Sequence, residues 1–264
     1  MKLCIEGIGA WGPGFGDWPS LREFLIQDGA AELPPAASPK PALIPAREQR
    51  RAPLLVRLGV EVAAQACADA GVEPADVLSV FASGMADMGI TDYMCRTLAA
   101  GHRQLSPTKF HNSVHNAASG YWSISTGCHA AANSVAAFRE TIPAALLEAA
   151  ALCVAEREPV LLVAFDVPGP KPVDLTDIAA PFGAALLLRP GQGARGLNLD
   201  VTAGAGAWPT LRSARLNALY ETNPSARMLA LLEALAGAST EALALPLGRA
   251  VALSLTAQAA EQAA

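Results

Sequence analysis

Two segments of this sequence are almost continuously apolar: VLSVFAS at residues 77–83 and PVLLVAFDV at residues 159–167. Runs of this length suit β-strands that are covered on both faces. Apolar residues recur at helical spacing over 54–70, where Gly71 supplies the stop. Strands buried on both faces need helices on both sides of a sheet, so the alternation predicts a layered α/β domain.

The same patterns predict the other elements of the fold. With 52% hydrophobic residues, a chain of 264 residues can bury a sizeable core. Further strands are expected at 2–8, 132–137, 183–190, 196–204 and 248–256, and further helices at 18–28, 89–100, 112–125, 140–155 and 224–236.

Charge, hydropathy and cysteine usage exclude several classes of protein. A net charge of −5 gives no electrostatic support to nucleic-acid binding. No uninterrupted apolar run reaches the roughly 18 residues of a membrane span, and the N-terminus lacks a secretory h-region. The five cysteines are an odd number without a C-x-x-C pair, which argues against disulfides and zinc knuckles and favours the cytoplasm.

The segment Gly7-Ile-Gly9-Ala-Trp-Gly12 matches the G-x-G-x-x-G pattern of dinucleotide-binding turns. That pattern requires a helix to open directly after it, so that backbone amides face a pyrophosphate. Pro13 and Pro19 prevent a helix from starting there on time. We therefore interpret the glycines as a strand followed by a tight turn, and we expect no cofactor.

His111 and His115 lie four residues apart, so on a helix they share a face, and His129 follows. Three histidines could bind a metal, but there is no H-E-x-x-H motif and no evident acidic ligand. Capping or interfacial histidines are the preferred interpretation, and no metal is expected.

Several segments, taken in order, resemble the N-terminal half of β-ketoacyl synthases of the thiolase-like superfamily. These are KLCIEGIGAWGPGFGDWPSLREFLIQDG, RRAPLLVRLGVEVAAQACADAGVEPADV, VFASGMADM, LSPTKFHNSVHNAASGYWSISTG, PVLLVAFDVP and PFGAALLLRP. HNSVHNAASGYWSI looks closer still to short chain-length-factor-like proteins of aryl polyene and xanthomonadin pigment synthesis. The resemblance covers residues 1–190 and implies a single N-terminal half of the thiolase-like α/β fold, with 191–264 as a strand-helix-strand extension that packs on the same domain.

An active enzyme of that family uses a cysteine at the N-terminus of a buried helix together with two histidines from the second half of the fold. The histidines here are His102, His111, His115 and His129, and none follows residue 129. The chain also ends where the second half would begin. The histidine part of such an active site is therefore expected to be absent.

Two alignments place the nucleophile differently. Ser125-Thr126-Gly127-Cys128 resembles the nucleophile motif, whereas an ungapped match anchored on Asn116 and Gly120 puts Arg139 there and Cys128 in a loop. The second alignment also places the helix at 140–155 correctly, so we prefer it. Arginine cannot form a thioester, and neither alignment completes a Cys-His-His set, so no catalytic residue is expected.

The resemblance implies a non-catalytic subunit that pairs with an active β-ketoacyl synthase, as a chain-length factor does, and shares its acyl carrier protein. Residues 105–137 would contact the partner and close the end of its acyl pocket, where a bulky side chain limits how many units fit. The residues expected to take part are Met85, Lys109, Phe110, His111, Asn112, His115, Asn116 and Trp122.

Three other interpretations stay open at this point. Cys128 with His129 or His115 could serve an acyltransferase or a thioesterase. A homo-oligomer could hold an acyl chain or a carrier protein without any synthase, because half of a duplicated fold exposes apolar surface that needs a partner. Arg47, Arg50 and Arg51 form either a solvated face or a docking site for the acidic carrier protein.

Overall fold

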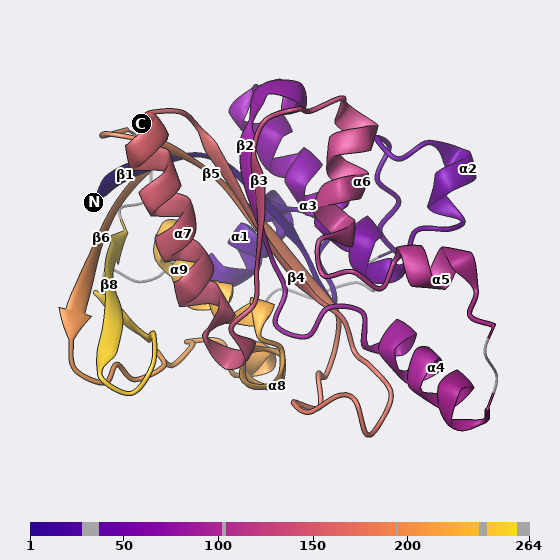
Figure 1. Ribbon diagram of the computed structural model, residues 1–264. Helices are drawn as coiled ribbons and strands as arrows, with labels where there is room; N and C mark the ends of the chain where they lie inside the picture. The colour runs from indigo at the N-terminus through magenta and orange to yellow at the C-terminus, as the bar shows by residue number, and fades with distance from the viewer. Residues whose placement is uncertain (28–36, 102–103, 194, 238–241, 258–264) are drawn as a thin grey trace.

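One eight-stranded sheet forms the centre of the computed structural model, which describes residues 1–27, 37–101, 104–193, 195–237 and 242–257 (Figure 1). The strand order is β3-β2-β4-β5-β1-β6-β8-β7. The strands are β1 (Lys2–Trp11), β2 (Leu78–Ala82), β3 (Ala132–Val135), β4 (Val160–Asp166), β5 (Phe182–Pro190), β6 (Gly196–Ala203), β7 (Leu243–Pro246) and β8 (Val251–Ala257).

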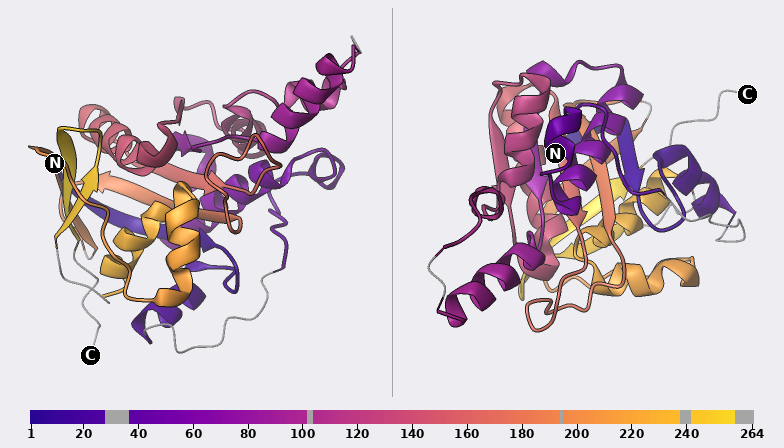
Figure 2. Two further views of the ribbon diagram at one scale, coloured as in Figure 1. Left: turned by 90° about the horizontal axis from the view of Figure 1, so that it is seen from below. Right: turned by 90° about the vertical axis from the view of Figure 1, so that its right-hand side faces the viewer.

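Helices lie on both sides of this sheet, which confirms the layered α/β prediction (Figures 1 and 2). The α-helices are α1 (Trp18–Ile26), α2 (Ala46–Gln49), α3 (Leu54–Ala70), α4 (Met88–Ala99), α5 (Pro107–His111), α6 (Ala117–Thr126), α7 (Thr141–Glu156), α8 (Asn217–Thr222) and α9 (Leu229–Leu235). Short 3₁₀ turns are η1 (Pro74–Asp76), η2 (Phe138–Glu140), η3 (Ala214–Leu216) and η4 (Ser225–Met228). Among the described helices, none is long and apolar enough to cross a membrane.

Strand β4 shows how the two layers are built. Leu161 and Val163 join the apolar cluster under α3 and α6, whereas Val160 and Leu162 join the cluster that contains α1, α7 and α9. Alternate side chains of a strand point to opposite faces, so a strand that is apolar throughout contributes side chains to both clusters. All seven residues of β4 are buried.

The glycines of β1 serve close packing of a helix on a strand. A Cβ atom built on Gly7 would lie 2.0 Å from the carbonyl oxygen of Ala66, and one on Gly9 would lie 2.1 Å from that of Val62. Both carbonyls belong to α3, which runs directly over β1. The strand continues through both glycines, so the segment is not a phosphate-binding turn.

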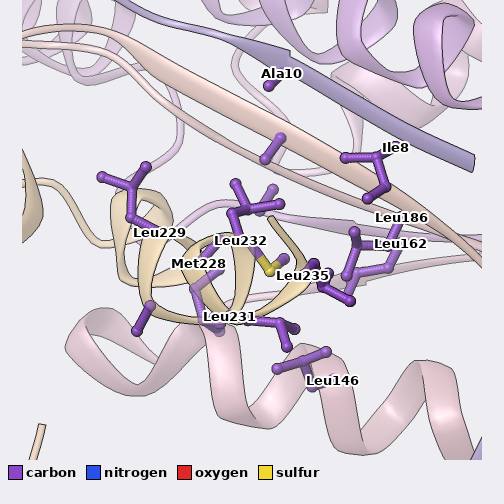
Figure 3. Packing of buried hydrophobic residues seen from close by; sticks show 14 of the residues in the cluster. Ile8, Ala10, Leu146, Leu162, Leu186, Met228, Leu229, Leu231, Leu232 and Leu235 are labelled. Atoms are coloured by element: carbon purple, nitrogen blue, oxygen red, sulfur yellow. The ribbon is translucent and has the colours of Figure 1, made fainter. Parts of the chain in front are cut away.

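Helix α9 is buried along its whole length. Figure 3 shows its leucines between Ile8 of β1 on one side and Leu146 of α7 on the other, within a single apolar cluster. Even Glu233 is only 4% exposed, and it accepts hydrogen bonds from the backbone amide of Arg212. The C-terminal elements therefore cover apolar surface of α7 and the sheet.

The C-terminal strands extend the same sheet. Strand β6 pairs antiparallel with the first residues of β1, and β8 and β7 follow outward. The sequence predicted a domain division at residue 190, and that division stays a prediction.

Helix α4 extends away from the rest of the molecule (Figures 1 and 2). Of the twelve residues of α4, only Met88 and Ile90 are buried. In the described part of residues 105–137, three large apolar side chains are exposed to solvent: Phe110, Val114 and Ile124. Exposed apolar side chains gathered in one region are typical of an interaction surface.

Candidate functional site at the carboxyl ends of the parallel strands

Among the described strands, β3, β2 and β4 run parallel to one another, so their carboxyl ends meet at one edge of the sheet, whereas β4 pairs antiparallel with β5. Ser83 follows β2, Asp166 ends β4, and Phe138 lies between β3 and α7. In open α/β sheets, ligands bind outside the carboxyl ends of such strands. This edge is therefore the candidate site.

The side chain of Asp166 is the centre of the site. It is fully buried, and its two oxygens accept four hydrogen bonds. Oδ1 accepts from Ser83 Oγ at 2.7 Å and from the Met85 amide at 3.2 Å. Oδ2 accepts from the Gly84 amide at 3.1 Å and from Ser225 Oγ at 2.6 Å. Burial raises the pKa of Asp166, and the four hydrogen bonds oppose that rise because they favour the charged form.

The segment Ser83–Ala86 forms a tight turn around this carboxylate. Ser83 Oγ accepts a hydrogen bond from the Ala86 amide at 2.9 Å, and Ala86 has a φ of +52°. A Cβ on Gly84 would lie 2.7 Å from the Cβ of Pro224 and 2.9 Å from the Phe138 oxygen. Only glycine fits between the segments that contain Pro224 and Phe138. These two segments and the side chain of Asp166 together hold the turn in place.

A C-terminal segment closes the same site. The side-chain nitrogen Nδ2 of Asn223 donates to the carbonyl oxygens of Asp166, at 3.2 Å, and Ala180, at 3.0 Å. Its side-chain oxygen accepts from the amides of Ser225, at 3.0 Å, and Ala226, at 3.2 Å. Sequence reasoning missed Asp166, Asn223 and Ser225. The available signal was that Asp166 ends an apolar strand next to the strand that ends in Ser83-Gly84.

Phe138 and Arg139 occupy the junction that leads into α7. Phe138 has a φ of +51°, which is uncommon for a residue with a side chain, and both residues are exposed. Thr141 fixes the junction, because its hydroxyl donates to the Phe138 oxygen at 2.7 Å and accepts from the Ala137 amide at 3.0 Å. The Arg139 guanidinium lies 5.7 Å from the Phe138 ring centre. Neither side chain offers a nucleophile at neutral pH.

Cys128 lies at the other end of β2. It is 3% exposed, and its thiol donates to the carbonyl oxygen of Val77, just before the strand. His115 instead contacts the carbonyl oxygen of Ser83, just after the strand, at 3.0 Å from its Nε2 atom. The two carbonyls are six residue steps apart along the strand, about 20 Å at 3.3 Å per step. His129 is exposed, so the fold brings Cys128 together with neither a buried imidazole nor the carboxyl edge.

The residues predicted to face a partner divide into exposed and buried groups. Phe110 is 61% exposed, and Lys109 places its Nζ atom 3.6 Å above the Tyr93 ring. His111 is exposed, and its ring meets the Tyr121 ring edge-on at 6.3 Å. Asn116, immediately before α6, is also exposed.

Asn112 and Trp122 lie inside the protein. Asn112 is 4% exposed and donates to the carbonyl oxygen of Arg51 at 3.2 Å. Trp122 is 1% exposed and packs against Phe81, with 6.4 Å between ring centres. Met85 and His115 are half-buried at the carboxyl edge. Any contact of Asn112 or Trp122 with a partner would therefore be indirect.

A groove of about 620 Å³ runs between α2, α5 and α6. Val114 and Ile124 line it on the apolar side, and Arg47 and Arg51 line it on the polar side, where both pair with Glu48. His111 also lines the groove, whereas His115 is not among the lining residues and contacts the carbonyl oxygen of Ser83. No group of three or more His, Cys, Asp or Glu side chains in the described part of the chain could hold a metal ion.

The solved structures that resemble this fold include ketosynthases and chain length factors. A ketosynthase (ApeO) in complex with its chain length factor (ApeC) from Xenorhabdus doucetiae matches with a TM-score of 0.73 and 21% identity, over 97% of this chain and 99% of that chain. The ishigamide ketosynthase/chain length factor matches with a TM-score of 0.63 and 14% identity, over 98% and 100%. A β-ketoacyl synthase from Burkholderia phymatum matches with a TM-score of 0.61 and 13% identity, over 86% and 70%. At these identities the likeness shows the fold.

No protein with a curated description matches this sequence. The family model for the N-terminal domain of β-ketoacyl synthases matches residues 26–251, which is most of the chain. The matching structures support the thiolase-like layered fold that the sequence predicted. The chain therefore belongs to the β-ketoacyl synthase N-terminal domain family.

Proposed function

We propose that this chain is a non-catalytic, chain-length-factor-like subunit that pairs with an active β-ketoacyl synthase. One observation carries the proposal: the junction before α7 holds Arg139 at the position where the preferred alignment with the family places a nucleophilic cysteine. No thioester can form on an arginine side chain. Cys128, the alternative nucleophile, is buried at the opposite end of β2.

The contact with the synthase is assigned to residues 105–137. Strand β3 is the last strand at its end of the sheet, so its outer edge has unpaired backbone groups. The exposed side chains of Phe110, Val114 and Ile124 lie in the same segment. An unpaired edge beside exposed apolar side chains suits a protein partner.

The acyl chain is assigned to a polyene or fatty-acid-type product built on acyl carrier protein, of the aryl polyene and xanthomonadin kind. Arg47, Arg50 and Arg51 are exposed near the groove and would attract the acidic carrier protein. The cytoplasm is the proposed location, which is consistent with five free cysteines.

Expression with and without the synthase of the same gene cluster tests the proposal. Alone, the purified chain should neither condense acyl and malonyl units nor become acylated on incubation with acyl carrier protein. With the synthase, size-exclusion chromatography should give a heterodimer that makes product. An acyl group on Cys128 by mass spectrometry would support a thiol enzyme instead. A homodimer that never binds the synthase would support a scaffold.

Replacing Phe110 with alanine should lengthen the product of the pair. A smaller side chain at the end of a closed pocket leaves room for further units, so we expect a shift by at least one extension unit. Phe110 is 61% exposed in the single chain, so the change should alter stability by no more than about 0.5 kcal/mol. Product lengths are measured by mass spectrometry of the released acyl chains.

Leu98→Ala is the matched control, because Leu98 is 57% exposed but lies on α4, outside residues 105–137. It should leave the product length unchanged. Identical products from wild type and Phe110→Ala in an intact complex would remove Phe110 from the pocket wall.

A further inference from the structure

The turn Ser83–Ala86 depends on one buried carboxylate. Three of the four hydrogen bonds to Asp166 come from this turn: the hydroxyl of Ser83 and the amides of Gly84 and Met85. The fourth comes from Ser225, in the C-terminal segment. No ion pair of the described residues involves Asp166, so hydrogen bonds alone compensate its burial.

An ionised carboxylate suits this position because it accepts hydrogen bonds and donates none. Two donors face each of its oxygens, so every contact is satisfied without a proton on the acid. A buried polar group held this completely fixes its surroundings in one arrangement. The turn needs such a constraint because its backbone is strained: Ala86 has a φ of +52°, and Gly84 packs closely against Pro224.

We propose that Asp166 is a positioning residue that holds the turn Ser83–Ala86 and thereby fixes Met85 as a wall of the acyl pocket. The inference rests on the proposed function, because Met85 limits product length only if this chain borders the pocket. It adds a buried residue that controls product length indirectly, through the position of Met85. Asp166 is fully buried, so it acts on Met85 through the backbone and touches no acyl chain.

The test compares Asp166→Asn with Ser225→Ala in the complex with the synthase. Asparagine keeps the size of the side chain but turns one acceptor oxygen into a donor, which cannot accept the bonds that face it. Ser225→Ala removes one bond to the same carboxylate and leaves the three bonds to the turn in place. Hydrogen exchange of the peptide that contains Gly84 and Met85 is measured by mass spectrometry, together with product length.

We expect Asp166→Asn to speed exchange in that peptide at least tenfold and to broaden the products toward longer chains. Ser225→Ala should change both far less. In a Met85→Ala background, Asp166→Asn should add nothing to product length, because the wall that it positions is already gone. A purely structural role would instead leave a further change in that background.

Three results would overturn the inference: unchanged exchange in Asp166→Asn, an additive effect in the double variant, or a Met85→Ala complex with unchanged products. None of these bears on whether the heterodimer forms, so the subunit role is judged separately by size-exclusion chromatography. If Asp166→Asn does not fold, Ser83→Ala replaces it, because it removes one bond to Asp166 and the acceptor of the Ala86 amide.

Discussion

A single methyl group added at Gly9 should cost this protein about 3 kcal/mol of its free energy of unfolding, at the upper end of what overpacking costs. The new Cβ would lie 2.1 Å from the carbonyl oxygen of Val62 and 3.0 Å from the Cβ of Gln65. Both atoms belong to α3, and a helix carbonyl cannot rotate away as a side chain can. The whole helix would have to move off β1.

That movement would also break a bond, because the Gln65 side chain accepts from the Ala10 amide at 3.0 Å. Domains are stable by only about 5–15 kcal/mol, so Gly9→Ala should lower the urea midpoint markedly. The control is Gly16→Ala, since a Cβ there meets nothing within 4 Å. Equal midpoints for the two variants would show that α3 does not pack on β1 as closely as described.

Ala132→Pro should weaken the heterodimer strongly. The carbonyls of Ala131 and Val135 accept hydrogen bonds from β2, so the alternate residues 132 and 134 turn their backbone groups to the open edge. Proline at 132 removes an outward N–H without breaking the ladder to β2, and proline is tolerated on edge strands. If the synthase pairs with this edge, the affinity should fall at least tenfold.

Ala132→Val separates backbone pairing from side-chain size, because valine adds bulk at the same place but keeps the N–H. Isothermal titration with the purified synthase should show near-native binding for valine and none, or very weak binding, for proline. Circular dichroism of both variants checks that the fold is retained. Full binding by Ala132→Pro would place the interface away from the outer edge of β3.

Periodicity predicted the long elements well. The helix expected at 54–70 is α3 with the same bounds, and Gly71 closes it with a φ of +65°. The helix expected at 112–125 begins only at Ala117, as α6, and the short helix α5 precedes it at Pro107–His111. Ser106 caps α5 from its side chain, with proline at the first turn, and the chain then turns near Asn112, which is buried against Arg51.

The candidate site was much harder to predict. Its hydrogen bonds join Asp166 to Ser83 and to Ser225, which lie 83 and 59 residues away in the sequence. No local pattern specifies such a contact, because a serine beside a strand end looks like any turn residue. Strand β7, four residues long and ending in Pro246, was missed for a similar reason: its alternation is too short to stand out.

The pairing of β1 with β6 has a consequence for how the chain folds. Lys2 lies opposite Asn198, and one apolar cluster contains both Leu3 and Leu255. These contacts join residues from the two ends of the sequence, so a long loop of chain must close before they contribute any stability. Folding should therefore be slow relative to a helical protein of equal length. During synthesis, β1 would stay unpaired until most of the polypeptide, including its partner strands β5 and β6, has been made. Unpaired strands that persist this long are prone to aggregate, so slow, cool expression should raise the yield of native protein.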